Sequence, residues 1–310
     1  MNAHDRVAVC SRSFSKNPEL CKELLSRYER VTFNDQGEQL EGPSLVRFLS
    51  GHDKAITALE ALTEQVLEKL PQLKVISKYG VGLDMIDKVA MRKHGKRLGW
   101  TAGVNRRSVS ELVIGFAIAL LRHIPAANKE VLSGTWRQHV GRQLTGKTVG
   151  IIGCGHIGKD LVPLLRAFDC EVLANDIIEF PEFYRRYSVT ALSLEELLQQ
   201  ADIVTLHVPF DETTEGMLDA TRLAMMKTSA ILINCARGGL VDEVALGAML
   251  SAQKLAGAGF DVLTDEPPGE IELLKCPNFL VTPHIGGSSY EAILAMGRAA
   301  IDGLDNNCIP

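Results

Sequence analysis

The sequence predicts an α/β protein with two domains, each built on a parallel β-sheet. Three observations predict this class. A glycine-rich turn joins a strand-like segment to a helix-like segment near the middle of the chain. Strand-like and helix-like segments alternate over the first hundred residues, which implies parallel strands joined by crossover helices. The length of 310 residues suits about two domains.

The glycine-rich turn lies between a short β-branched run, Thr148–Ile152, and apolar residues at helical spacing over residues 157–168. Gly153, Gly155 and Gly158 have the spacing G-x-G-x-x-G. In this context the first glycine allows the tight turn, the second lets the backbone approach a pyrophosphate, and the third lets the helix pack closely on the strand. The stretch therefore predicts a Rossmann-like dinucleotide site.

A second strand is expected over Glu171–Asn175, and it ends at Asp176, 18 residues after Gly158. An acid at this place accepts hydrogen bonds from a ribose 2′-hydroxyl and repels a 2′-phosphate. The sequence therefore favours NAD over NADP.

Composition and charge exclude several classes of protein. The formal net charge is −5 and the arginine pairs are isolated, so nucleic acid is not an expected partner. The seven cysteines form no C-x-x-C pair and no metal site is expected, which is typical of a reduced cytoplasmic protein. The first residues do not resemble a secretory signal, and the longest apolar run, residues 112–121, is half a membrane span. A soluble protein is expected.

The first hundred residues alternate between the two kinds of segment. Strands are expected at residues 6–10, near Val31, near Ala55 and at residues 73–77, and helices at residues 18–28, 43–49 and 63–70. The fourth strand leads into KYGVGLDMID, which contains Lys78, Val81 and Gly82. Two interpretations remain open for this turn: a cradle of backbone N–H groups for a substrate carboxylate, or an ordinary glycine-rich βα turn.

Between the two halves, SVSELVIGFAIALL reads as an apolar helix opened by a capping box of Ser108 and Glu111. Residues 126–144 lack periodicity and contain Trp136. A loop of that length is usually functional or an interface arm, so we expect it to reach a second subunit.

The second half has four more expected strands, at residues 202–207, 230–235, 256–262 and 278–282, which makes six with the first two. Capping residues Ser193 with Glu196, and Asp242, open two of its helices. The last helix, residues 289–304, is expected to return to the first domain. The expected domains are therefore 1–105 with 286–310, flavodoxin-like and discontinuous in sequence, and 106–285.

Three side chains with useful chemistry follow expected strands of the second half: Arg237 in NCARGG, Glu266 in DVLTDEPP and His284 in TPHIGG. The carboxyl ends of parallel strands are where such sheets bind ligands. Beside a nicotinamide, an imidazole can take a hydroxyl proton, a carboxylate can orient that imidazole, and an arginine can bind a substrate carboxylate. Taken alone, His284 could be a packed loop residue and Glu266 a solvated turn residue.

These motifs together resemble the D-isomer-specific 2-hydroxyacid dehydrogenase family, through YGVGLDMID, NRRSVSELVIG, GKTVGIIGCGHIGK, LHVPFDETTEGML, INCARGGLVDEVAL, GAGFDVLTDEPP and TPHIGGSSYEA. The resemblance covers nearly the whole chain. It implies an NAD-dependent enzyme that transfers hydride between the nicotinamide and C2 of a D-2-hydroxy or 2-oxo acid.

The resemblance also implies roles for individual residues. His284 would be the general acid/base, Glu266 its hydrogen-bond partner, and Arg237 the ligand of the substrate carboxylate and carbonyl. Lys78, Val81 and Gly82 would bind substrate. The implied cofactor-binding residues are Gly153, Gly155, His156, Ile157, Gly158, Asp176, His207, Pro209, Cys235, Asp261 and Gly286. Trp136 falls in the family's dimer arm, which implies a homodimer.

Two departures affect the expected substrate. Where many 3-phosphoglycerate dehydrogenases have a phosphate-binding arginine after the third strand, this sequence reads ITALEALT, with Ala58 and Glu60. The chain also ends at Pro310, which implies a plain two-domain form. The expected substrate is 3-phosphoglycerate, with glyoxylate or hydroxypyruvate as the alternative. A binding protein resembling the NADH-sensing corepressors of this fold is a further alternative.

Overall fold

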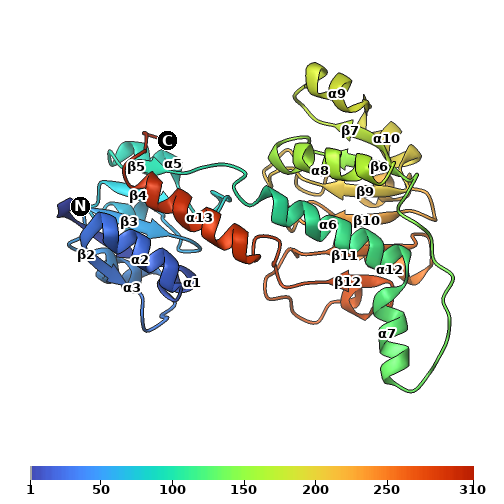
Figure 1. Cartoon of the computed structure of the whole chain (residues 1–310), viewed down its shortest axis with the longest axis horizontal. Helices are drawn as coiled ribbons and strands as arrows, with labels where there is room; N and C mark the ends of the chain where they lie inside the picture. Colours follow the sequence, from blue (N-terminus) through green and yellow to red (C-terminus); the bar gives the residue numbers. More distant parts are fainter. Residues whose placement is uncertain (1) are drawn as a thin grey trace. The chain divides into compact units, whose positions relative to one another are not determined.

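The computed structural model describes residues 2–310, with side chains from His4 onward. The chain divides into two compact domains. The first comprises the chain up to Asn105 together with Ser288–Pro310, and the second comprises Arg106–Gly287. The second boundary lies two residues beyond the expected one. Figure 1 shows the elements of each domain.

The first domain has a parallel sheet in the order β2-β1-β3-β4-β5. This is the order of flavodoxin-like folds, so the predicted fold class is confirmed. The strands are β1 (Asn2–Val9), β2 (Tyr28–Phe33), β3 (Lys54–Thr57), β4 (Val75–Lys78) and β5 (Arg97–Gly99). The sequence did not predict β5, because a strand of three residues is too short to show a pattern.

The helices of this domain are α1 (Arg12–Ser15), α2 (Pro18–Arg27), α3 (Gly42–Leu49), α4 (Glu64–Leu67), α5 (Lys88–Lys93) and α13 (Tyr290–Gly303). Asn17 begins α2 by accepting hydrogen bonds from two backbone N–H groups of its first turn. The prediction for α4 was too long, since only one turn of residues 63–70 is α-helical.

Helix α13 joins this domain because small residues let it approach closely. A Cβ atom at Gly297 would lie 2.3 Å from Leu20, and one at Gly99 would lie 2.2 Å from the carbonyl oxygen of Gly303. The Ser77 hydroxyl donates to the carbonyl oxygen of Ala300 at 2.6 Å. The C-terminal helix is thus a structural part of the first domain.

The second domain has a parallel sheet in the order β12-β11-β10-β9-β6-β7-β8. Its strands are β6 (Thr148–Ile152), β7 (Glu171–Asn175), β8 (Val189–Ala191), β9 (Ile203–Leu206), β10 (Ile231–Asn234), β11 (Gly257–Phe260) and β12 (Phe279–Val281). The prediction of six strands missed β8, an edge strand of three residues with two exposed side chains. The order around β6 is that of a dinucleotide-binding sheet, extended by one strand.

Its helices are α6 (Arg106–Leu121), α7 (Ile124–Leu132), α8 (His156–Ala167), α9 (Pro181–Tyr187), α10 (Leu194–Gln200), α11 (Ala220–Leu223) and α12 (Glu243–Ser251), with the 3-10 helix η1 (Glu272–Lys275). Helices α6 and α8 lie side by side on one face of the sheet (Figure 1). Helices α10, α11 and α12 contribute to the apolar core on the other face. The core therefore has two layers, one on each side of the strands.

Two local predictions in this domain were wrong. Helix α6 begins at Arg106, so Ser108 lies inside its first turn and is no cap. Residues 126–132, expected to be a loop, belong to α7, whose Pro125 stands in its first turn. The predicted capping box of Ser193 and Glu196 and the cap of Asp242 are both confirmed.

Among residues 2–310 no single helix is long and apolar enough to cross a membrane. Helices α6 and α7 pass this criterion of length and composition only as a pair, which is bent by 62°.

Candidate cofactor and catalytic site

The glycines of the turn after β6 differ in the space around them. Gly153 has a φ of 93°, and a Cβ atom there would lie 2.6 Å from the carbonyl oxygen of His207. A Cβ atom at Gly158 would lie 2.4 Å from the carbonyl oxygen of Gly153. These two positions therefore exclude any side chain, because real Cβ atoms do not approach backbone so closely.

Gly155 differs, because among residues 2–310 no heavy atom beyond Gly155 and its two chain neighbours lies within 4 Å of the place of its missing Cβ. It is the N-cap of α8 and supplies no capping side chain. The first N–H groups of α8, from His156 and Ile157 onward, thus stand at an open helix N-terminus, which favours an anionic ligand.

Asp176 directly follows β7, beside the end of β6. Its carboxylate accepts hydrogen bonds from the N–H groups of Cys154 at 2.6 Å and Ile178 at 2.9 Å. The acid is thereby held next to the glycine-rich turn.

Glu266 and His284 come from loops that follow β11 and β12. Nδ1 of His284 lies 2.8 Å from Oε2 of Glu266, and Oε1 of Glu266 accepts from the Leu263 N–H at 3.2 Å. Both side chains remain accessible, with exposed fractions of 50% for His284 and 40% for Glu266. The pair leaves Nε2 of the imidazole as the nitrogen available for a proton transfer.

The loop that bears His284 is fastened by Asp261, which is 1% exposed. The Asp261 carboxylate accepts hydrogen bonds from Thr282 Oγ1 at 2.5 Å and from the N–H groups of Ile285 and Gly286, each at 2.7 Å. The His284 N–H donates to the Asp261 carbonyl oxygen at 2.8 Å, and His284 has a φ of 55°. Asp261 and Gly286, both expected to contact the cofactor, are thus bonded to each other.

Arg237 is half-buried in the loop after β10, and its guanidinium donates to the carbonyl oxygen of Ala236 at 2.7 Å. The buried Asn234 shapes this loop, since its side chain donates to the Arg237 carbonyl oxygen and accepts from the Ala236 N–H. Burial, and then the nearby Asp261, raise the pKa of the Cys235 thiol well above its ordinary value. Cys235 is therefore a neutral thiol at neutral pH.

His207 stands at the end of β9 and bonds the hydroxyl of Thr205 through Nε2 at 3.0 Å. Burial lowers the pKa of this imidazole to about 3, and its buried Nδ1 has no hydrogen-bond partner within residues 2–310. His207 is thus neutral over the physiological range, while Pro209 nearby is exposed.

The expected substrate residues of the first domain lie at the end of β4 (Lys78) and in the turn that follows it (Val81 and Gly82). Lys78 is 6% exposed and its ammonium donates to the carbonyl oxygen of Ala58. The carbonyl oxygen of Val81 accepts from the Trp100 indole at 3.0 Å. Within the described part of the chain, no hydrogen bond involves the N–H of Val81 or Gly82. These two donors can therefore serve a ligand.

The chain is similar in sequence to one family of known proteins. Residues 114–286 match the family model described as the D-isomer specific 2-hydroxyacid dehydrogenase, NAD binding domain. The hydroxypyruvate reductase of Thermotoga maritima is 35% identical over 271 residues, which cover 86% of this chain and 88% of that protein. The chain belongs to the D-isomer-specific 2-hydroxyacid dehydrogenase family.

Other members of this family are similar over different lengths. The D-3-phosphoglycerate dehydrogenase of Bacillus subtilis is 39% identical over 235 residues, which cover 75% of this chain and 45% of that protein. The chain therefore spans less than half the length of that relative. The D-lactate dehydrogenase structure from Aquifex aeolicus, complexed with NAD and lactic acid, is 25% identical with a TM-score of 0.81 and covers 97% of this chain and 93% of its own.

As in other D-isomer-specific 2-hydroxyacid dehydrogenases, the second domain is an NAD-binding domain. Its geometry fits that cofactor. The open space at Gly155 and the N-terminus of α8 suit a pyrophosphate, and Asp176 beside them suits a ribose 2′-hydroxyl. No group of three or more metal-ligating side chains is found among residues 2–310.

Two residues that support the site were not predicted from the sequence. Asn234 forms hydrogen bonds with the loop of Arg237, and Thr282 donates to Asp261, which fastens the loop of His284. Each stands within a motif, NCARGG or TPHIGG, so the signal was their position next to a reactive side chain.

Proposed function

We propose that the chain is an NAD-dependent dehydrogenase acting at C2 of a small D-2-hydroxy acid or its 2-oxo acid. The observation that carries this proposal is the accessible pair of His284 and Glu266, on loops at the carboxyl end of the NAD-binding sheet. NAD, when bound, supplies the hydride acceptor at the nicotinamide ring.

The proposed work of the chain is a proton transfer. In oxidation His284 takes the C2 hydroxyl proton on Nε2, because Nδ1 is engaged by Glu266. The Glu266 carboxylate stabilises the imidazolium that results. In reduction the same imidazolium returns the proton to the carbonyl oxygen.

Two separate sets of groups, one in each domain, are candidates for binding the substrate carboxylate. Arg237 offers a guanidinium that can bind a carboxylate with two hydrogen bonds. The N–H groups of Val81 and Gly82 are a second candidate set of donors.

The first candidate substrate is 3-phosphoglycerate, supported by similarity to D-3-phosphoglycerate dehydrogenases. Hydroxypyruvate or glyoxylate is the second, and one observation favours it. Glu60 accepts a hydrogen bond from the Ala58 N–H at 2.6 Å, while the Lys78 ammonium bonds the carbonyl oxygen of the same residue. A carboxylate held here repels a phosphate, and the lysine is already hydrogen-bonded.

The test is a panel of 2-oxo acids assayed by oxidation of NADH at neutral pH. Turnover of 3-phosphohydroxypyruvate would support the first substrate, and faster turnover of hydroxypyruvate or glyoxylate would support the second. Wild-type protein that turns over none of them, although it binds NADH, would reject the proposed activity.

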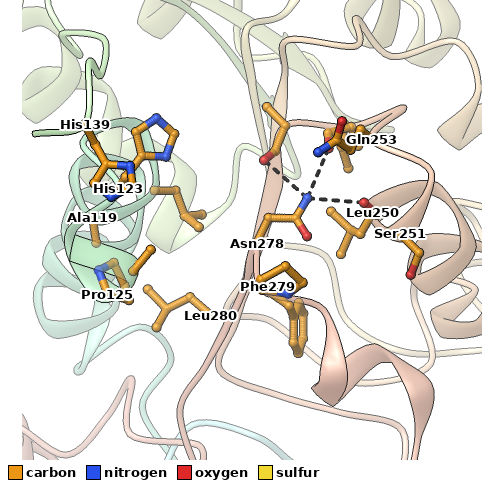
Figure 2. A pocket seen from close by; sticks show the side chains of 15 residues that line it. Ala119, His123, Pro125, His139, Leu250, Ser251, Gln253, Asn278, Phe279 and Leu280 are labelled. Atoms are coloured by element: carbon orange, nitrogen blue, oxygen red, sulfur yellow. Dashed lines mark hydrogen bonds between the residues drawn. The ribbon is translucent and has the colours of Figure 1, made fainter. Parts of the chain in front are cut away.

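We also propose that the protein is a homodimer formed through the arm of α7 and the residues after it. Leu132, Trp136 and Val140 are 80%, 86% and 94% exposed on this arm. Beside it lies a cavity of about 530 Å³ between Pro125 and His123 on one side and the segment from Asn278 to Leu280 on the other (Figure 2). A second copy of the arm would cover these apolar surfaces.

Light scattering coupled to size-exclusion chromatography tests the dimer. We expect the wild type at twice the chain mass, and a Trp136→Ser, Val140→Ser variant shifted toward the single-chain mass. A monomeric wild type at micromolar concentration would reject the dimer.

The seven free cysteines support a reducing, cytoplasmic compartment, which localisation of a tagged chain would test.

A further inference from the structure

The proposed reaction needs Glu266 to stay in line with His284, and Glu266 stands on an exposed loop after β11. Within this loop, Oε1 of Glu266 accepts a hydrogen bond from the Leu263 N–H at 3.2 Å. A second contact, outside the reacting groups, holds the same loop. Oε1 of Glu243 accepts hydrogen bonds from both the N–H and the hydroxyl of Thr264, each at 2.8 Å.

Glu243 is a firm point of attachment. It is the first residue of α12, whose N-cap Asp242 accepts from the N–H groups of Val244 and Ala245 at 3.0 and 2.9 Å. The helix is packed into the core through the buried Leu246 and Leu250. A carboxylate on the first turn of such a helix is well placed to hold a neighbouring loop.

The same loop also lies against the loop that bears Arg237. A Cβ atom at Gly238 would lie 2.0 Å from the Leu263 carbonyl oxygen and 2.5 Å from the Thr264 nitrogen. The Glu266 loop therefore contacts Gly238 through Leu263 and Thr264, which stand three and two residues before Glu266, and contacts Glu243 through Thr264. The close packing against Gly238 leaves Thr264 little room to shift.

We propose that Glu243 is a positioning residue for the Glu266–His284 pair, which it orients by anchoring Thr264. This inference rests on the proposed function. Glu243 touches neither the imidazole nor Glu266, so it acts through the loop alone. Positioning groups of this kind influence turnover, since a displacement of about 1 Å can cost about 100-fold in rate.

The experiment compares Glu243→Ala with Glu243→Gln, which retains an acceptor oxygen, and with the matched control Glu195→Ala. Glu195 stands in the first turn of α10 and bonds Arg222 at 3.2 Å, in the same domain. We expect Glu243→Ala to lower kcat by about 10- to 100-fold, with the KM for NADH within about twofold of wild type. Glu243→Gln should recover most of kcat, and Glu195→Ala should match wild type.

A second readout does not need turnover. Amide hydrogen exchange of residues 263–266 should be at least several-fold faster in Glu243→Ala than in wild type, because the Thr264 N–H loses its acceptor. Equal kcat in an active wild type and Glu243→Ala would overturn the inference. If the wild type is inactive on every 2-oxo acid, the proposed function fails, and unchanged exchange at Thr264 would then separately overturn the anchoring role.

Discussion

Nδ1 of His284 lies 2.8 Å from Oε2 of Glu266, although the two residues are 18 positions apart and follow different strands. The contact exists because β11 and β12 are neighbours in the sheet and end at the same edge. It leaves the imidazole oriented and half exposed, which is the condition that a general acid/base requires.

Exchange of His284 for Ala should lower kcat by about 100- to 10,000-fold, because the group proposed to transfer the C2 proton is lost. NADH affinity, measured by fluorescence titration, should stay within about threefold of wild type. Glu266→Gln should cause a smaller loss, since it keeps a hydrogen-bond acceptor but not the charge. Retained turnover in His284→Ala would contradict the assigned role.

Two glycines of the same turn should respond differently to a methyl group. Gly158→Ala should lower the midpoint of thermal unfolding by on the order of 5 °C, because its Cβ would collide with the Gly153 carbonyl. Gly155→Ala should unfold like wild type but bind NADH about tenfold more weakly, since its Cβ enters the open space proposed for the pyrophosphate. Equal NADH affinity in Gly155→Ala and wild type would argue against this placement.

Asp176 should determine the choice between NADH and NADPH. Asp176→Asn removes the charge but keeps an oxygen for the Cys154 N–H, so the turn should be preserved. We expect the ratio of kcat/KM for NADPH to that for NADH to rise by about tenfold or more, because repulsion of the 2′-phosphate is removed. An unchanged ratio in a variant with wild-type thermal stability would show that other residues select the cofactor.

Glu60 should disfavour phosphorylated substrates. Glu60→Gln should raise kcat/KM for 3-phosphohydroxypyruvate by about tenfold relative to hydroxypyruvate, because a negative charge beside the Ala58 peptide is removed. Glu64→Gln is the matched control, since Glu64 pairs with Lys93 at the surface and should leave the ratio unchanged. If Glu60→Gln and the control Glu64→Gln have the same ratio of kcat/KM for the two substrates, Glu60 is excluded as a determinant of specificity.

The first domain should lose stability in alkali through Tyr28. Burial, and then the hydrogen bond with Asp305 at 2.6 Å, raise the pKa of the Tyr28 phenol to about 12, against about 10 in an unfolded chain. A raised pKa means that the stabilisation is fully present below pH 10 and is lost as the pH rises toward 12.

Urea unfolding measures this effect. The chain has two tryptophans, Trp100 in the first domain and Trp136 in the second. In a Trp136→Phe background, tryptophan fluorescence therefore reports on the first domain alone. Between pH 10 and 12 the free energy of unfolding should fall more steeply than in Tyr28→Phe, by up to about 1.4 kcal/mol per pH unit. Parallel curves for the two proteins would contradict the assigned pKa.

Local sequence determined the elements whose physics is local. The β-branched run of β6, the three glycines and the cap residues of α10 and α12 each act within a few residues, so they could be recognised without the rest of the fold. The sequence also determined the α/β class and the family, because the motifs recur along nearly the whole chain. It missed β5 and β8, since three residues at a sheet edge carry no periodicity.

Only the tertiary structure decided which groups are already engaged. Asp261 and Lys78 were predicted to bind cofactor and substrate, and that remains a prediction. The fold adds that Asp261 holds the His284 loop and that Lys78 donates to Ala58. The role of Glu243 could not be predicted from the sequence, because its partner Thr264 is 21 residues away on a loop. Contacts of this kind depend on which strands become neighbours, and that order follows from the packing of the whole sheet and not from any short stretch.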